Sequence, residues 1–198
     1  MGDRSVDILA VTKGFGADAI AAAASAGCTM VGENYAQELV DKLAALDVAA
    51  VRPAIHFVGR LQSNKVRRLT DVVDVWESID RASLLDEIAR RRPGATVLIQ
   101  VNATGEAGKG GCPPAEVETL AGHARSLDLD LNGVMTVGPT DGDVAATRRA
   151  FGIARRLVDE LGLATCSMGM TDDLDVALDA GTTRVRVGTG LFGPRPAP

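Results

Sequence analysis

Short apolar runs alternate with longer amphipathic segments along the whole of this 198-residue chain. The short runs are rich in β-branched residues and predict eight strands, at residues 6–13, 29–32, 54–59, 72–77, 96–102, 131–136, 165–168 and 184–188. The longer segments carry apolar residues three or four positions apart and predict seven helices, at residues 18–26, 36–45, 64–70, 81–91, 114–127, 143–161 and 174–180. This alternation is typical of parallel strands joined by crossover helices.

Eight such strands in a chain of this length predict a closed (β/α)8 TIM barrel that spans residues 1–198 as a single domain. An open doubly wound sheet is the alternative. The barrel is favoured because a phosphate-binding pattern lies on the last predicted strand, where barrels commonly place one. The loop at residues 103–114 is long and contains four glycines, so it is either a mobile lid over the barrel mouth or an ordinary loop.

The composition of the chain argues against several classes of function. The formal charge of −5 and the single Trp and Tyr argue against nucleic-acid binding, which needs a basic surface and often aromatic stacking platforms. The three cysteines are scattered and predict reduced thiols rather than a disulfide framework or a metal site. The chain has neither an apolar run long enough to cross a membrane nor the layout of a signal peptide, and we expect a cytoplasmic monomer with no membrane partner.

Lys13 ends the first predicted strand and is the first candidate for chemistry. It alternates with Leu9 and Val11, so its side chain points inward if those two fill the barrel. Burial disfavours the charged amine and lowers its pKa, and a neutral amine is the form that attacks an aldehyde to give a Schiff base. The alternative is a lysine that extends from the barrel mouth into solvent.

The eighth predicted strand ends in a pattern suited to a phosphate. Arg186 is followed by Gly188, Thr189 and Gly190, whose backbone N–H groups and hydroxyl could approach a phosphate closely. Ser167, at the end of the seventh strand, could donate a second hydroxyl. A tight turn that merely closes the barrel is the alternative for the glycines.

Six strings of residues resemble the pyridoxal phosphate homeostasis protein family, which has a fold like the N-terminal domain of alanine racemase. They occur in the family's order over nearly the whole chain, at residues 10–13 (AVTK), 32–38 (GENYAQE), 56–65 (HFVGRLQSNK), 133–136 (GVMT), 167–173 (SMGMTDD) and 185–193 (VRVGTGLFG). The resemblance implies a barrel with pyridoxal 5′-phosphate (PLP) at its carboxyl-end mouth.

The same resemblance implies a role for each matching residue. Lys13 would carry PLP as a Schiff base, Arg186 would face the pyridine nitrogen and Asn34 would lie near the ring. The phosphate would be held by Ser167, Gly188 and Thr189. An arginine at the ring nitrogen would keep that nitrogen unprotonated and so weaken the ring as an electron sink.

Two features depart from the family pattern. Relatives commonly have a helical segment ahead of the first strand, which here is predicted to begin at Val6, so the covering of the eighth strand is left open. Gly14-Phe15-Gly16 follows Lys13, where a lysine and a proline are frequent in relatives. The second difference changes the loop beside the expected cofactor and leaves Lys13 in place.

Three functions remain open. The first is a PLP carrier and regulator that holds the cofactor without robust catalysis and passes it to apo forms of PLP-dependent enzymes. The second is a racemase or related enzyme. A racemase needs a second acid/base group in addition to the lysine, and in alanine racemase that group is a tyrosine from another domain. The third is a barrel that uses Lys13 on a phosphorylated sugar aldehyde. His56 is expected to be a hydrogen-bonded structural histidine.

Overall fold

The computed structural model describes residues 5–46 and 52–195. Its strands are β1 (Asp7–Val11), β2 (Met30–Glu33), β3 (Ala54–Phe57), β4 (Val75–Ile79), β5 (Thr96–Gln100), β6 (Asp130–Met135), β7 (Thr165–Ser167) and β8 (Arg184–Val187). The helices are α1 (Ala17–Ser25), α2 (Ala36–Ala45), α3 (Ser63–Leu69), α4 (Ala82–Arg91), the 3-10 turn η1 (Pro114–Glu116), α5 (Val117–Ser126), α6 (Val144–Glu160), α7 (Leu174–Asp179) and α8 (Thr189–Phe192).

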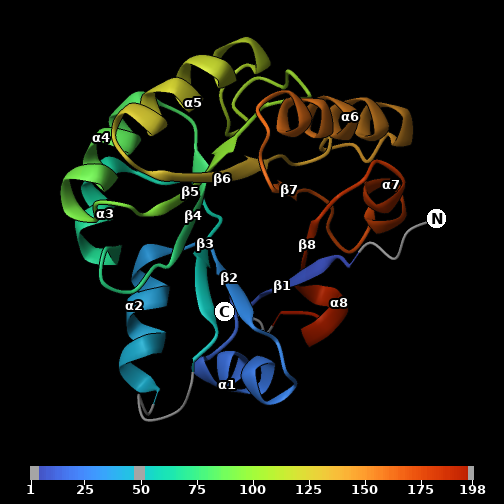
Figure 1. Ribbon diagram of the computed structural model, residues 1–198. Helices are drawn as coiled ribbons and strands as arrows, with labels where there is room; N and C mark the ends of the chain where they lie inside the picture. The colour runs from blue at the N-terminus through green and yellow to red at the C-terminus, as the bar shows by residue number, and fades with distance from the viewer. Residues whose placement is uncertain (1–4, 47–51, 196–198) are drawn as a thin grey trace.

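The strands form a closed parallel barrel in chain order, from β1 to β8, and the helices surround it (Figure 1). The barrel closes where β1 pairs with β8, with Leu9 opposite Arg186 and Ala10 opposite Val187. The predicted (β/α)8 barrel is therefore confirmed, and the open doubly wound alternative is wrong. Closure brings the first and last strands together, so the residues that follow β1 and β8 lie at the same mouth.

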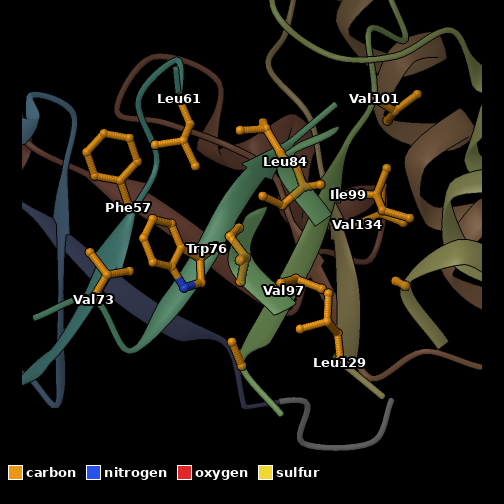
Figure 2. Packing of buried hydrophobic residues seen from close by; sticks show 14 of the residues in the cluster. Phe57, Leu61, Val73, Trp76, Leu84, Val97, Ile99, Val101, Leu129 and Val134 are labelled. Atoms are coloured by element: carbon orange, nitrogen blue, oxygen red, sulfur yellow. The ribbon is translucent and has the colours of Figure 1, made fainter. Parts of the chain in front are cut away.

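The main apolar core lies between the outer face of the barrel and the helices. Outward-facing strand residues such as Val97, Ile99 and Val134 are fully buried there (Figure 2). Trp76 on β4 is also fully buried, with its ring centroid 6.4 Å from that of Phe57 on β3. Burial of such aliphatic and aromatic surface supplies most of the driving force for folding.

The interior of the barrel is partly polar. Glu77 on β4 contacts Ser167 on β7 and Arg184 on β8, which belong to strands that are not its neighbours. Side chains of such distant strands can meet only across the inside of the barrel. Leu9 and Val11 lie there as well, because a Cβ built on Gly32 would come within 3.2 Å of both side chains. Lys13 thus follows two inward-facing residues, as the alternation predicts.

Several predicted strands run up to two residues past their observed ends, as at residues 6–13, where β1 ends at Val11, and three larger differences occur. The fourth strand was predicted at residues 72–77, but Val72 and Val73 form a turn at the end of α3 by donating to the Leu69 carbonyl. Their apolar side chains close that turn, and the strand begins at Val75. The structure also adds η1 before α5, and α8 directly after the last strand, where no helix was predicted.

The outer face of β8 is covered by α7 and α8. A Cβ on Gly169 would meet Ala177 of α7 and Val185 of β8, and one on Gly190 of α8 would lie 3.0 Å from Val187. Both valines are buried, whereas Ile8 on β1 is 49% exposed. The described residues include no helix that is long and apolar enough to pass through a membrane.

Candidate functional site

A cavity of about 300 Å³ lies at the carboxyl-end mouth of the barrel. It gathers five of the six residues proposed from the sequence, which come from the ends of β1, β2 and β8: Lys13, Asn34, Arg186, Gly188 and Thr189. The sixth, Ser167, does not line it. Segments from opposite ends of the chain therefore meet in one pocket, because β1 and β8 are neighbours in the closed barrel.

Lys13 lies in this cavity in a state suited to nucleophilic chemistry. Burial lowers the pKa of its amine, and the positive charges of Arg195 and Arg186 lower it further. The carboxylate of Glu38 opposes them. A lowered pKa increases the fraction of neutral amine near pH 7, which is the form that adds to a carbonyl.

Arg186 is buried and rigidly held. Its guanidinium donates to the Ser167 carbonyl at 2.8 Å, to the Ser167 hydroxyl at 3.0 Å and to the Thr136 carbonyl at 2.7 Å. Burial lowers the pKa of Arg186, while the carboxylate of Glu77 raises it. An arginine stays protonated in proteins under such conditions, so it presents a fixed positive charge to the cavity.

Below the cavity, Glu77 organises the charged interior of the barrel. It bonds His56 Nδ1 at 2.7 Å, accepts from the Ser167 hydroxyl at 2.7 Å and accepts from Arg184 at 3.2 Å. Burial alone would raise the pKa of Glu77, but the bond to His56 and the charges of His56, Arg184 and Arg186 lower it to about 2. His56 is hydrogen-bonded and buried, in keeping with the expected structural role.

Ser167 belongs to this lower layer rather than to the cavity wall. Its hydroxyl donates to Glu77 and accepts from Arg186, and it is fully buried. Thr171 lines the cavity near α8 together with Thr189, and its hydroxyl lies 3.3 Å from the Thr189 hydroxyl and accepts from the Gly190 amide. Sequence reasoning missed Thr171, although it stands in the same string, just beyond the turn at Gly169.

The glycines of the turn into α8 allow the chain to pack closely against neighbouring residues. A Cβ on Gly190 would lie 3.0 Å from a methyl of Val187 and 3.3 Å from a methyl of Thr171, and one on Gly188 would lie 3.3 Å from the Val11 carbonyl. Side chains at these glycines would crowd the cavity wall. Two hydroxyls and glycine backbone at one point are the groups that commonly bind a phosphate.

Asn34 offers a free acceptor on the other side of the cavity. Its side-chain oxygen is buried and has no hydrogen-bond partner among the described residues. The segment after β3 packs closely on the backbone of Asn34, since a Cβ on Gly59 would lie only 2.0 Å from the Asn34 carbonyl oxygen. A buried polar atom without a partner is costly, so a ligand that donates a hydrogen bond here would relieve that cost.

Two further cavity residues were not foreseen. Arg195, beyond α8, lines the cavity and places its aliphatic stem against Gly14, where a Cβ would lie 3.0 Å from its Cδ. Gly14 has a positive φ of 77°, which explains a glycine directly after Lys13. Phe15 also lines the cavity, and its ring packs against Phe192 of α8 with centroids 5.4 Å apart.

The long loop after β5 is anchored to the next loop. Glu106 accepts from the amide and hydroxyl of Thr140 and pairs with Lys109, and these bonds lower its pKa to about 2. Lys109 also donates to the Gly138 carbonyl. No residue of the segment 103–114 lines the cavity. The loop is thus held against the β6–α6 connection and does not cover the cavity in this structure.

Comparison with known proteins gives the class first. The chain matches the family model described as alanine racemase, N-terminal domain, over residues 3–196. The alanine racemase of Clostridium difficile 630 shares the fold, with a TM-score of 0.79 at 13% identity over 100% of this chain and 57% of that chain. The family match over nearly the whole chain and the barrel fold place the chain in the alanine racemase N-terminal-domain class.

Proteins of higher sequence identity show the family within this class to which the chain belongs. The pyridoxal phosphate homeostasis protein of Pseudomonas aeruginosa is 40% identical over 198 residues, covering 96% of this chain and 85% of the relative, and that of Haemophilus influenzae is 39% identical over 205 residues, covering 97% and 86%. PipY of Synechococcus elongatus PCC7942, solved with PLP bound, has a TM-score of 0.86 at 31% identity, covering 98% of this chain and 94% of that chain. This chain belongs to the pyridoxal phosphate homeostasis protein family.

The Glu77 network makes a prediction about acid stability. Glu77→Gln should destabilise the fold by about 3–5 kcal/mol near pH 7, because it removes the negative partner of buried positive charges. The folded-state pKa of Glu77 is depressed to about 2, so its contribution is present above the unfolded pKa and is lost as pH falls towards 2. Denaturant unfolding should therefore show the gap between wild type and variant shrinking from pH 5 to pH 3. A gap that stays constant with pH would contradict the assignment.

Proposed function

We propose that this protein binds PLP as a Schiff base on Lys13 and acts in PLP homeostasis as a carrier that holds the cofactor without robust catalysis. The observation that carries the proposal is one cavity that contains both a lysine with a lowered pKa and a turn of glycines and threonine hydroxyls suited to a phosphate. A close relative of the same fold holds PLP. PLP supplies an aldehyde and a phosphate, and the cavity offers a group for each.

Each residue would bind a different part of PLP. Lys13 provides the amine, and Thr171, Thr189 and the glycine backbone beside them would hold the phosphate. Arg186 would face the pyridine nitrogen, and the unpartnered Asn34 oxygen would accept a hydrogen bond near the ring. Ser167, which the resemblance placed at the phosphate, would instead act through the guanidinium of Arg186, because its hydroxyl is already bonded there.

The lining of the cavity favours a carrier over a racemase. A racemase needs acid/base groups on both faces of the substrate α-carbon. Among the described residues, the ionisable side chains of the cavity are Lys13, Asp172, Arg186 and Arg195, with no tyrosine or histidine. Tyr35 is exposed outside it.

The site assignment can be tested by borohydride reduction of the PLP-loaded protein, followed by peptide mapping. The phosphopyridoxyl group should lie on Lys13, and Lys13→Ala should lose the visible absorbance of the imine while its melting temperature stays close to wild type. Lys65→Ala, on α3 and outside the cavity, is the matched control and should keep both. Modification of a different lysine, or no modification after reconstitution, would refute the assignment.

The phosphate assignment predicts different effects for the two hydroxyl residues. Thr171→Val should weaken PLP binding about tenfold or more, because a hydrogen bond to a charged group contributes about 1.5–3 kcal/mol. It should leave the binding of pyridoxal, which lacks the phosphate, nearly unchanged. Ser167→Ala should weaken PLP and pyridoxal to the same extent, since its hydroxyl bonds Arg186. Titrations followed by absorbance measure both, and a phosphate-selective loss in Ser167→Ala would reverse the two roles.

The carrier function predicts transfer without turnover. The PLP-loaded protein should restore activity to the apo form of a PLP-dependent enzyme added to it, and should convert no amino acid when incubated alone. Chiral chromatography of the amino acids and the activity of the recipient enzyme measure the two outcomes. Racemisation or decarboxylation by the protein alone would favour the enzyme hypothesis, and a protein that stays colourless with PLP would favour the metabolite-binding barrel.

A further inference from the structure

An ionic cluster, in which Lys42 and Glu33 are buried and Glu38 is 26% exposed, lies beside the cavity, between the ends of β1 and β2 and helix α2. Lys42 of α2 is only 5% exposed, and its amine lies 2.6 Å from Glu33 Oε1 and 2.5 Å from Glu38 Oε1. The same amine donates to the backbone carbonyl of Thr12 at 2.7 Å. None of the three charged residues lines the cavity, so binding a ligand directly does not explain them.

The cluster holds the chain on both sides of Lys13. Lys42 bonds the carbonyl of Thr12, which belongs to the peptide group before Lys13. Glu38 accepts from the amide of Gly14 at 2.6 Å, which belongs to the peptide group after it. The Thr12 hydroxyl is also fixed, by a 2.6 Å bond to Glu33. Both peptide planes that flank Lys13 are therefore tied to the same helix.

Burying such a cluster costs free energy of desolvation, so a contribution to stability alone does not explain it. Elsewhere the barrel packs on its helices through apolar side chains (Figure 2). Burial raises the pKa of Glu33, although the bonds from Lys42 and Thr12 oppose that rise. Well-packed apolar residues often stabilise a protein as much as a buried ion pair does, because the charges lose their hydration. The cluster costs desolvation free energy and bonds the backbone on both sides of Lys13. This combination indicates that it positions Lys13.

We propose that Glu38 and Lys42 act as positioning residues, which clamp the two peptide groups beside Lys13 and so aim its amine into the cavity. The inference rests on the proposed function, in which Lys13 reacts with the aldehyde of PLP. Lysine has a long flexible side chain, so a fixed backbone confines its amine to fewer positions. Correct placement of a nucleophile is one of the main sources of rate in such reactions.

Glu38 has a second, electrostatic effect on the same amine. The charged groups around Lys13 are Glu38 on α2, Arg186 on β8, Arg195 after α8 and Asp172 before α7. Glu38 raises the pKa of Lys13, against burial and the two arginines. Removing its charge should therefore lower that pKa, whether or not the clamp is kept. This separates the effect of charge from the effect of position.

The experiment compares Glu38→Ala, Glu38→Gln and the control Gln37→Ala, on the exposed face of the same helix. Formation of the PLP imine is followed by absorbance as a function of pH. The midpoint of the profile reports the pKa of Lys13, and the plateau at high pH reports positioning, because all of the amine is then neutral. Glutamine keeps an oxygen that can accept from Gly14, whereas alanine does not.

We expect both Glu38 variants to shift the midpoint to lower pH, and only Glu38→Ala to lower the plateau rate, by about tenfold. Gln37→Ala should match wild type in both. If Glu38→Ala and Glu38→Gln lower the melting temperature but leave plateau and midpoint unchanged, the cluster is merely structural and the proposal is overturned. Equal plateau losses in Ala and Gln would also overturn the clamp.

A double variant tests the positioning role of Lys42 without leaving the buried carboxylate of Glu33 unpaired. Lys42→Met leaves the carboxyl of Glu33 buried without its amine, so the fold itself could fail. In Lys42→Met/Glu33→Gln the buried charges are removed together, and the bond to the Thr12 carbonyl is lost. A folded double variant should show a reduced plateau rate, and a plateau equal to that of wild type would contradict the role of Lys42.

Labelling of the protein without PLP keeps this inference separate from the proposed function. Competitive acetylation, read by mass spectrometry with Lys65 as the internal reference, measures the reactivity of Lys13 against pH. The midpoint for Lys13 should shift to lower pH in Glu38→Gln. If wild type forms no PLP adduct on Lys13 but this shift occurs, the cofactor assignment fails and the coupling to Glu38 stands. If the adduct forms and neither labelling nor the plateau changes, only the clamp fails.

Discussion

The pairing of β1 with β8 is the constraint on which the site depends. Lys13 and the Gly188–Gly190 turn are far apart in the sequence, and the register that sets Leu9 beside Arg186 brings them to one mouth. Parallel strands that close into a barrel have all their carboxyl ends at the same face. An amine and a phosphate-suited turn then share a cavity of about 300 Å³.

Electrostatics link this cavity to the layer of side chains below it. The buried arginines Arg184 and Arg186 would be costly in a purely apolar barrel, and Glu77 compensates them with one carboxylate of strongly lowered pKa. Through Ser167, the same carboxylate is connected to the guanidinium that faces the cavity. The fixed positive charge of Arg186 in turn helps to lower the pKa of Lys13. The polar interior thus stabilises the barrel and also adjusts the amine at its mouth.

The cavity and the cluster on α2 act on Lys13 from opposite sides. The cavity determines which ligand groups Lys13 can meet, and the proposed clamp by Glu38 and Lys42 determines where its amine points. The proposed carrier function would benefit from a site that is formed before the cofactor arrives, because the cost of ordering then does not reduce affinity. A site built on strand ends and anchored to one helix meets that need better than one built on a flexible loop.

The sequence by itself determined the barrel and predicted five residues that line the cavity, because both depend on local patterns. Apolar periodicity distinguished strands from helices, and the strings around Lys13, Asn34 and Arg186 placed those residues at strand ends. Only the tertiary structure showed that Thr171 and not Ser167 lines the cavity, since the glycine turn at Gly169 separates the two hydroxyls. It alone revealed Arg195 at the cavity and the bonds from Glu38 and Lys42 to the backbone beside Lys13. The contacts of Glu38 and Lys42 are made to backbone groups of residues distant in the chain. Because every residue carries the same backbone groups, a sequence pattern does not predict which of them a side chain will contact.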